Sequence, residues 1–351
     1  MTAVDLDLPP LGALDGIPKA DEPQKAKDFT SDQEVRWCPG CGDYIILNAV
    51  RSFLPELGLR RENIVFISGI GCASRFPYYL NTYGMHSIHG RAPTIATGLA
   101  ATRPDLSIWV VTGDGDALAI GGNHLIHALR RNVNIKILLF NNRIYGLTKG
   151  QYSPTSEIGK ITKSTPVGSL DHPFNPVSLA LGAEATFVAR TLDSDRAQLT
   201  DVLRAAAQHR GTALVEIFQN CPIFNDGAFD VLKDRESAAS RLIKLRHGEP
   251  IRFGVDGAFA VVRDGFDLAV VKADEIDESE IVVHDQRNLQ LAFALSRLSD
   301  QELTHTVTGV FRSASRPTYD GAVREQLAAA RNGHQPDLAA LLRGKDTWTV
   351  T

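Results

Sequence analysis

The chain contains few cysteines and no long apolar segment. Four cysteines among 351 residues exclude a small disulfide-rich scaffold of the secreted type. No apolar run approaches the roughly 20 residues that a membrane-spanning helix requires. Residues 1–29 lack the basic start and the apolar core of a signal peptide. We therefore expect a cytoplasmic protein without membrane attachment.

An excess of basic residues is also missing. Lys and Arg number 37 and Asp and Glu number 41, which gives a formal net charge of −4. Nucleic-acid binding depends on cationic side chains that neutralise phosphates, so we expect no nucleic-acid partner. Hydrophobic residues make up 43% and charged residues 22%, which is typical of a globular protein that buries a sizeable core.

Apolar strand-like runs alternate with helical stretches through most of the first 218 residues. The expected strands are apolar on both faces, as in a buried parallel sheet. They span 64–68, 107–112, 135–140, 187–189 and 213–218, and the expected helices span 43–54, 92–103, 119–131 and 195–210. The alternation predicts an α/β fold with a mostly parallel sheet and helices on both faces. Such sheets bind ligands beyond the carboxyl ends of their strands.

Three regions are expected along the chain. Residues 1–30 are rich in Pro, Gly, Asp and Lys without periodicity, and we interpret them as a flexible tail or as an arm that orders on a partner. Residues 31–230 form the α/β domain, and residues 231–351 form a C-terminal extension without a recognisable chemical motif. The elements expected in this extension are helices at 234–244, 289–298 and 322–331 and strands at 251–253, 259–262 and 268–271.

Two polar motifs follow neighbouring expected strands. Gly113-Asp114-Gly115 closes one strand, and Asn141-Asn142 closes the next. Glycines let the backbone approach a diphosphate, and a helix N-terminus favours its charge. Carboxylate, amide and carbonyl oxygens are hard ligands that suit Mg²⁺. Either motif alone is a common turn, but together they predict a magnesium–diphosphate site. A dinucleotide site fits less well, because no G-x-G-x-x-G follows the first strand.

The four cysteines are Cys38, Cys41, Cys72 and Cys221. Cys72 and Cys221 follow expected strands, so one four-cysteine site is geometrically simple. Four thiolates suit zinc or a 4Fe–4S cluster. Structural zinc usually uses two tight pairs, and only Cys38 and Cys41 form one, which favours the cluster. A thioredoxin-like pair at Cys38 and Cys41 would leave the other two unexplained, and inert buried cysteines are a further alternative.

Six segments combine these motifs with others, namely WCPGCGD, GIGCASRFPYY, HGRAPTIATGLA, TGDGDALAIGGNH, FNNRIYGLTKGQYSPTS and NCP. Together they resemble the beta subunit of 2-oxoacid:ferredoxin oxidoreductases, most densely over residues 36–225. The resemblance implies a thiamine-diphosphate-binding fold with an iron–sulfur cluster. The implied enzyme decarboxylates a 2-oxoacid, passes electrons to ferredoxin and transfers the acyl group to CoA. GCASRFPYY and YGLTKGQ look like the 2-oxoglutarate branch, which would form succinyl-CoA and CO₂.

The resemblance also assigns site residues. The implied cluster ligands are Cys38, Cys41, Cys72 and Cys221, and the implied Mg²⁺ ligands are Asp114, Asn142 and the Ile144 carbonyl. The expected thiamine-diphosphate contacts are Gly71, Cys72, His89, Gly90, Arg91, Gly113, Asp114, Gly115, Asp116, Asn142, Ile144, Tyr145, Gly146, Leu147 and Thr148. The expected catalytic residues are His89, Arg91 and Arg75.

The side chains of these catalytic candidates suit the roles. His89 and Arg91 can donate hydrogen bonds to a diphosphate or a developing oxyanion. Arg75, three residues past a cluster cysteine, is expected to pair with the distal carboxylate of 2-oxoglutarate. His86 and His124 are further candidates, whereas Glu157 and Lys160 are expected to be solvated.

The resemblance implies partners outside this chain. A separate alpha subunit, or a fused alpha–gamma subunit, would close over the thiamine in an α₂β₂-type heterotetramer, and ferredoxin would take the electrons. Three alternatives stay open. The substrate could be pyruvate or a branched 2-oxoacid, the chain could be a non-redox thiamine enzyme with structural zinc, or it could be a non-enzymatic four-cysteine zinc protein.

Overall fold

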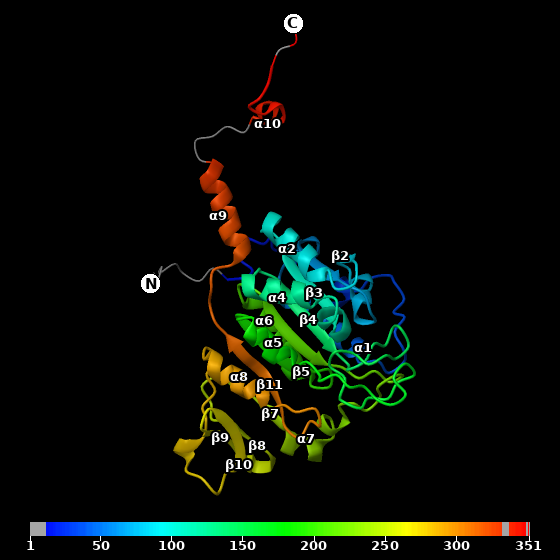
Figure 1. Ribbon diagram of the computed structural model, residues 1–351, viewed down its shortest axis with the longest axis vertical. Helices are drawn as coiled ribbons and strands as arrows, with labels where there is room; N and C mark the ends of the chain where they lie inside the picture. The colour runs from blue at the N-terminus through cyan, green and yellow to red at the C-terminus, as the bar shows by residue number, and fades with distance from the viewer. Residues whose placement is uncertain (1–11, 332–336, 349, 351) are drawn as a thin grey trace.

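The computed structural model describes residues 12–331, 337–348 and 350. Its centre is an eight-stranded sheet with the strand order β2, β1, β3, β4, β6, β5, β11, β7 (Figure 1). The strands are β1 (Ile64–Ser68), β2 (Tyr83–His86), β3 (Ser107–Gly113), β4 (Lys136–Asn141), β5 (Phe187–Leu192), β6 (Ala213–Phe218), β7 (Leu242–Lys244) and β11 (Thr306–Ser313). Neighbouring strands run parallel except β11 and β5, which are antiparallel.

Helices cover both faces of the sheet. The α-helices of the described residues are α1 (Asp43–Phe53), α2 (Ala92–Thr102), α3 (Asp114–Leu118), α4 (Gly122–Arg131), α5 (Pro176–Gly182), α6 (Arg196–Gln208), α7 (Arg235–Arg241), α8 (Leu289–Arg297), α9 (Tyr319–Arg331) and α10 (Leu338–Arg343). Side chains of α2, α4, α5 and α8 pack in one core cluster, and those of α1 and α6 pack in the other. Alternate strand residues point to opposite clusters, since Val65 belongs to the first and Phe66 to the second.

Side-chain caps set the start of several helices. The Asn175 side chain accepts a hydrogen bond from Ser178 N at α5, and the Asp195 side chain accepts one from Gln198 N at α6. At the end of α4, Asn132 adopts a left-handed conformation with a φ of 54°. At the start of α6 and the end of α4, these short-range contacts explain why the helix limits lie close to those expected from the sequence.

The expected α/β architecture is confirmed, with differences at particular elements. The segment expected as one helix over 234–244 was partly wrong: α7 ends at Arg241, and β7 then pairs with β11. Helix formation after the Gly-Asp-Gly turn begins earlier than expected, at Asp114, and α3 and α4 are separate helices. The sequence interpretation missed β2, α5 and β11. The antiparallel β11 pairs with β5 on one side and with the edge strand β7 on the other, and most of its residues are buried.

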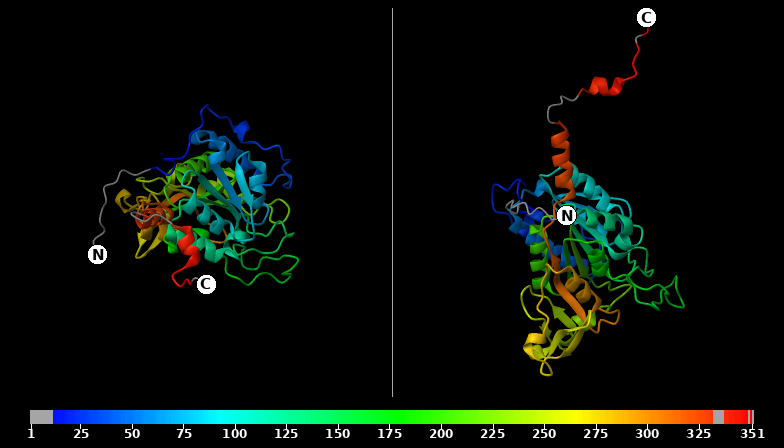
Figure 2. Two further views of the ribbon diagram at one scale, coloured as in Figure 1. Left: turned by 90° about the horizontal axis from the view of Figure 1, so that it is seen from above. Right: turned by 60° about the vertical axis from the view of Figure 1, so that its left-hand side comes forward.

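The C-terminal extension contributes to two sheets. β8 (Arg252–Phe253), β9 (Phe259–Asp264) and β10 (Asp267–Lys272) form the expected small antiparallel sheet, which lies below the main body (Figure 1). Further along, β11 enters the main sheet, and α9 then leads away from the body (Figure 2). The boundary at residue 230 stays a prediction, although strands beyond it complete the main sheet.

The flexible tail expected over residues 1–30 was wrong for most of its described part. Residues 1–11 of that tail lie outside the described residues. Ile17 and Phe29 are buried, and Lys19 and Thr30 form β-bridges with Leu59 and Leu80. Apolar side chains in this polar segment therefore anchor it to the body. In the part of the chain that the structure describes, no helix has the length and apolar content needed to cross a bilayer.

Candidate active site

The Gly-Asp-Gly and Asn-Asn motifs emerge from paired strands at one edge of the sheet. Gly113 at the end of β3 lies opposite Phe140 of β4, one residue before Asn141. Asp114 begins α3 and is almost fully buried. Burial raises the pKa of its carboxyl to about 6, against hydrogen bonds that lower it. A buried carboxylate without a basic partner is a suitable site for a cation.

Two hydroxyl groups orient the Asp114 carboxylate. Ser153 Oγ donates to Asp114 Oδ2 at 2.5 Å, and Thr155 Oγ1 lies 2.6 Å from the same oxygen. Thr155 Oγ1 also lies 2.8 Å from Asn141 Oδ1. The loop after β4 therefore ties the two motifs together through its serine and threonine side chains.

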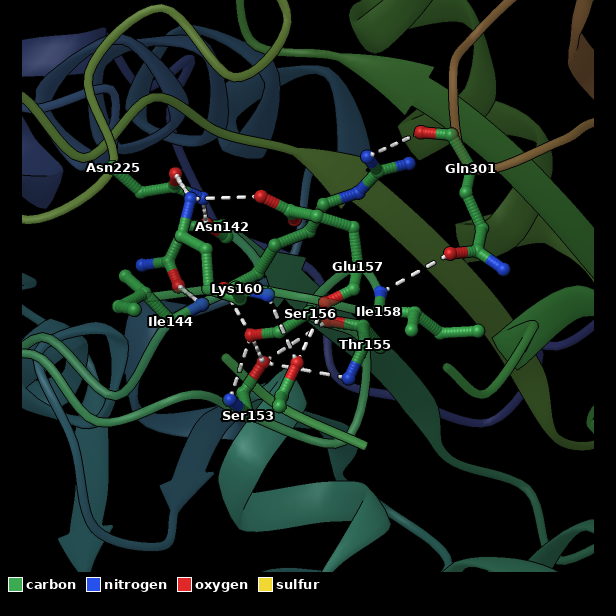
Figure 3. Close-up of polar contacts among 12 residues, drawn as sticks. Asn142, Ile144, Ser153, Thr155, Ser156, Glu157, Ile158, Lys160, Asn225 and Gln301 are labelled. Carbon is green, nitrogen blue, oxygen red and sulfur yellow. Dashed lines mark hydrogen bonds and ion pairs between the residues drawn. The ribbon is translucent and has the colours of Figure 1, made fainter. Parts of the chain in front are cut away.

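The loop that supplies these hydroxyls is held by its own polar contacts (Figure 3). Asn142 Oδ1 accepts a bond from Ile144 N at 3.2 Å, and Asn225 Nδ2 donates to the Asn142 carbonyl at 2.9 Å. Lys160 Nζ donates to Glu157 Oε1 at 2.8 Å and to Asn225 Oδ1 at 2.5 Å. The expectation that Glu157 and Lys160 are solvated was wrong, because their pairing holds the loop against the segment after Cys221.

Asp116 connects three loops at the same edge. Its Oδ1 accepts hydrogen bonds from Ile70 N at 3.1 Å and Gly90 N at 2.7 Å, and it contacts His89 Nδ1. Its Oδ2 accepts a bond from Thr112 Oγ1 at 2.7 Å. A carboxylate can only accept, so His89 Nδ1 carries the hydrogen and Nε2 stays available as a proton acceptor. Asp116 thus gathers the backbone around the expected thiamine site.

Other residues expected to contact thiamine diphosphate also have defined positions in the structure. The Tyr145 hydroxyl donates to the Gly115 carbonyl at 3.1 Å, and a Cβ on Gly115 would lie 2.1 Å from the Tyr145 ring. Burial raises the pKa of Tyr145 to about 12. Arg91 Nη1 contacts His124 Nε2, and burial, then the Arg91 charge, lowers the pKa of His124. Leu147 and Thr148 are exposed beyond Gly146.

The four cysteines are all free thiols. A Cβ placed on Gly146 would lie 3.6 Å from both Cys72 Sγ and Cys221 Sγ, so these two sulfurs flank the same glycine. Gln219 Nε2 donates to Cys41 Sγ at 3.1 Å. No group of three or more His, Cys, Asp or Glu side chains is already arranged as a metal site in the described residues. Ligation by all four cysteines stays a prediction.

The thiols near this point are shielded from water. Burial, followed by the charge of Asp43, raises the pKa of Cys41 and also raises that of Cys72 to about 12. Without a metal both are protonated at neutral pH, so metal binding would release protons. The positive charge of Arg75 opposes this rise at Cys72 only slightly, after burial and the charges of Asp43 and the other cysteines. His86 Nδ1 lies 3.3 Å from the Tyr78 hydroxyl, next to this segment.

Sequence reasoning missed several polar residues that contact Asp114 or are linked to it through Asn141. They are Ser153, Thr155, Arg190 and Glu216. Arg190 and Glu216 pair inside the sheet at 2.7 Å, next to a cavity of about 460 Å³ that the segment around Ser299 also lines. The signal was present in the sequence, because each is the single charged residue in an otherwise apolar strand, FVARTL and ALVEIF.

Comparison with known proteins identifies the type of domain. The family described as "Thiamine pyrophosphate enzyme, C-terminal TPP binding domain" matches residues 69–217. The chain is 73% identical over 340 residues to the 2-oxoglutarate oxidoreductase subunit KorB of Mycobacterium tuberculosis, covering 95% of this chain and 91% of that protein. The chain belongs to the beta-subunit family of the 2-oxoacid:ferredoxin oxidoreductases.

Less similar proteins of the same family also match this chain in sequence or in structure. The 2-oxoacid:ferredoxin oxidoreductase subunit beta of Saccharolobus solfataricus is 43% identical over 192 residues, covering 54% of this chain and 63% of that protein. The solved 2-oxoglutarate:ferredoxin oxidoreductase from Magnetococcus marinus matches with a TM-score of 0.73 and 34% identity, covering 92% of this chain and 95% of that one. That structure contains 2-oxoglutarate, coenzyme A and succinyl-CoA. The expected family and fold are therefore confirmed.

Proposed function

We propose that this beta subunit binds thiamine diphosphate, Mg²⁺ and a 4Fe–4S cluster and takes part in the CoA-dependent oxidative decarboxylation of 2-oxoglutarate to succinyl-CoA. One observation carries the proposal. The Gly-Asp-Gly and Asn-Asn motifs lie with two of the four cysteines at the carboxyl ends of neighbouring strands. Asp114 lies there, and Cys72 and Cys221 flank Gly146, which closely follows Asn142. The close relatives act in this reaction class by their names.

The residues present fit a magnesium–diphosphate group. Asp114 is buried, has no basic partner within salt-bridge distance in the described residues, and is oriented by two hydroxyls. Asn142 and the Ile144 carbonyl would complete the protein ligands for Mg²⁺. Gly113 is partly exposed at the start of α3, and a Cβ placed on it would meet no atom closer than 4.0 Å, which leaves room for a diphosphate beside its backbone. Thiamine diphosphate, when bound, supplies the nucleophilic carbon and the electron sink for decarboxylation.

Residues of this chain would handle protons and orientation. The contact of His89 Nδ1 with Asp116 leaves Nε2 to hold or release a proton. Arg91 would donate to a phosphate or carboxylate oxygen, with neutral His124 accepting from its Nη1. Arg75 would pair with the distal carboxylate of 2-oxoglutarate, since a guanidinium matches a carboxylate and Arg75 follows Cys72 by three positions in the sequence.

The cysteines fit an iron–sulfur cluster. Two of their sulfurs flank a glycine that leaves the neighbouring space free of a side chain, and Gln219 donates to a third sulfur. A cluster held by Cys38, Cys41, Cys72 and Cys221 would carry electrons one at a time to ferredoxin. Cys38 is exposed, so an electron acceptor would approach from its side.

A companion alpha subunit would cover the edge of the site. Side chains around Gly90 are apolar and exposed, which is unusual for a surface that stays in water. They include Ile88, two positions before Gly90, and Ile120, whose Cγ2 would lie 2.8 Å from a Cβ placed on Gly90. The proposed α₂β₂-type assembly would bury them and close the thiamine site, and it would also supply part of the CoA site.

The test is electron paramagnetic resonance of the anaerobically purified complex, co-expressed with the companion subunit and reduced with dithionite. Iron, sulfide, zinc and thiamine diphosphate are quantified in the same sample. A low-temperature signal of a reduced 4Fe–4S cluster, with succinyl-CoA formed from 2-oxoglutarate and CoA, supports the proposal. Stoichiometric zinc without sulfide would instead identify a non-redox protein. Turnover of pyruvate alone would overturn the assignment of 2-oxoglutarate as the substrate.

A further inference from the structure

A buried ion pair lies behind the proposed magnesium site. Arg190 of β5 and Glu216 of β6 are paired at 2.7 Å (Nε to Oε2), with side chains 3% and 0% exposed. Removing both charges from water is costly, and apolar side chains of similar volume would often stabilise a sheet at least as well. The pair therefore calls for a role besides stability.

The ion pair determines how the neighbouring amide is oriented. Asn141 Nδ2 donates to Glu216 Oε1 at 2.7 Å, and Arg143 N donates to Asn141 Oδ1 at 3.1 Å. A carboxylate can only accept and a backbone N–H can only donate, so the amide of Asn141 has a single satisfactory orientation. Its oxygen consequently faces Thr155.

Thr155 connects this amide to Asp114. Its Oγ1 lies 2.8 Å from Asn141 Oδ1 and 2.6 Å from Asp114 Oδ2, so its one hydroxyl proton lies between two acceptors. Ser153 Oγ donates to the same Asp114 oxygen. Both contacts engage Oδ2, which holds the carboxylate in one orientation with Oδ1 turned away from the hydroxyls.

We propose that Arg190, Glu216, Asn141 and Thr155 form a positioning relay that presents Asp114 Oδ1 to the cation of the diphosphate cofactor. The relay rests on the proposed function, because it needs a cation at Asp114, but none of its members touches that cation. Partners of metal ligands matter in this way because they orient the ligand; their loss typically weakens metal binding about 10- to 100-fold.

The first test measures Mg²⁺ affinity directly, without turnover. The complex with the companion subunit is stripped of cofactor and titrated with Mg²⁺ by calorimetry at saturating thiamine diphosphate. Thr155→Val should raise the Kd for Mg²⁺ about 10- to 100-fold, and Thr155→Ser, which restores the hydroxyl, should return it close to wild type. Thr191→Val is the matched control, because Thr191 is equally buried on β5 but bonds to Gln198 instead.

The second test removes the distant end of the relay. The double variant Arg190→Met/Glu216→Leu should fold, because an apolar pair replaces the ion pair as a unit. It should still weaken Mg²⁺ binding, since Asn141 loses the acceptor that orients it. A folded double variant with wild-type Mg²⁺ affinity would limit the relay to Thr155, and an unchanged affinity in Thr155→Val would overturn the proposal.

The wild-type titration separates the two levels of inference. If the wild-type complex binds neither Mg²⁺ nor thiamine diphosphate, the proposed function fails. If the wild type binds both and Thr155→Val binds them equally well, only the relay fails. If Thr191→Val weakens binding as much as Thr155→Val, the effect comes from general loosening of the sheet and the relay is again rejected.

Discussion

At the scale of single residues, the candidate site residues lie where polar side chains interrupt apolar strands or follow them. Cys221 comes three residues after β6, and its sulfur lies beside Gly146 together with that of Cys72. Asp114 follows β3 directly. These positions hold reactive groups on rigid elements while leaving one side open to a ligand.

Cys221→Ser should lower iron content and electron transfer to ferredoxin much more than thiamine-diphosphate binding. A serine hydroxyl is a poor ligand for iron–sulfur clusters, whereas the proposed magnesium ligands lie on other segments. The measurements are iron and sulfide content, the reduced-cluster signal and calorimetric binding of thiamine diphosphate. Equal loss of both cofactors would argue against separate sites.

Arg75→Ala should reduce kcat/KM for 2-oxoglutarate selectively. A hydrogen bond to a charged group contributes about 1.5–3 kcal/mol, which corresponds to a loss of about 10- to 100-fold. Pyruvate lacks the distal carboxylate, so its kcat/KM should change little. Arg103→Ala is the control, since Arg103 pairs with Asp105 on the surface. An unchanged ratio between the two substrates would eliminate this role.

At the scale of elements, a polar cluster lies at the ends of the strands that are opposite the candidate site. Lys136 at the start of β4 donates to the carbonyls of His209 and Gly211 at 2.6 and 3.0 Å. His209, which follows α6, lies 2.8 Å from Thr186 Oγ1 through its Nε2. The cluster joins the end of a helix to two strands. Its charge state should therefore affect the free energy of unfolding.

Stability should fall as the pH drops below about 6.5, and His209 should contribute. Burial, followed by the charge of Lys136, lowers the pKa of His209 from 6.5 to about 3. The unfolded chain therefore binds an extra proton between these values, so its free energy falls relative to the folded state as pH decreases. One such proton changes the free energy of unfolding by up to about 1.4 kcal/mol per pH unit.

The variant His209→Gln keeps a polar side chain at this position but cannot titrate. Its thermal unfolding midpoint, measured from pH 7 down to pH 4, should depend less on pH than that of the wild type. Thermal scans of His127→Gln serve as the control, because His127 is exposed on α4 and is not part of this cluster. Parallel curves for His209→Gln and wild type would contradict the assignment.

At the scale of the whole molecule, the strand-end edge presents apolar side chains around the site. Ile88 is 72% exposed and lies next to His89 and Gly90. Such exposure near a functional site is typical of an interface with another subunit. The chain belongs to a family of beta subunits, which supports assembly through this edge.

Ile88→Asp should weaken association with the companion subunit, because a charge would be buried at the contact. The assembly is measured by analytical ultracentrifugation of the co-expressed proteins. Val255→Asp is the matched control, as Val255 is 68% exposed but lies in the C-terminal extension. Full assembly of the Ile88→Asp variant would place the interface elsewhere.

The sequence by itself determined the layered α/β architecture and the residues of the strand-end motifs. Continuous apolar runs specify buried parallel strands. Gly-Asp-Gly, Asn-Asn and the cysteine segments are local motifs that can be recognised without knowledge of the fold. The same local signals misled at 12–30 and 234–244, where packing against distant residues overrode composition.

Only the tertiary structure decided how distant residues cooperate. β11 joins β5 across more than 100 positions, and Asp116 gathers loops that follow β1 and β2. The line from Arg190 through Glu216, Asn141 and Thr155 to Asp114 likewise crosses three strands and a loop. Hydrogen bonds of this kind depend on distance and direction in space, which the order of residues along the chain does not specify.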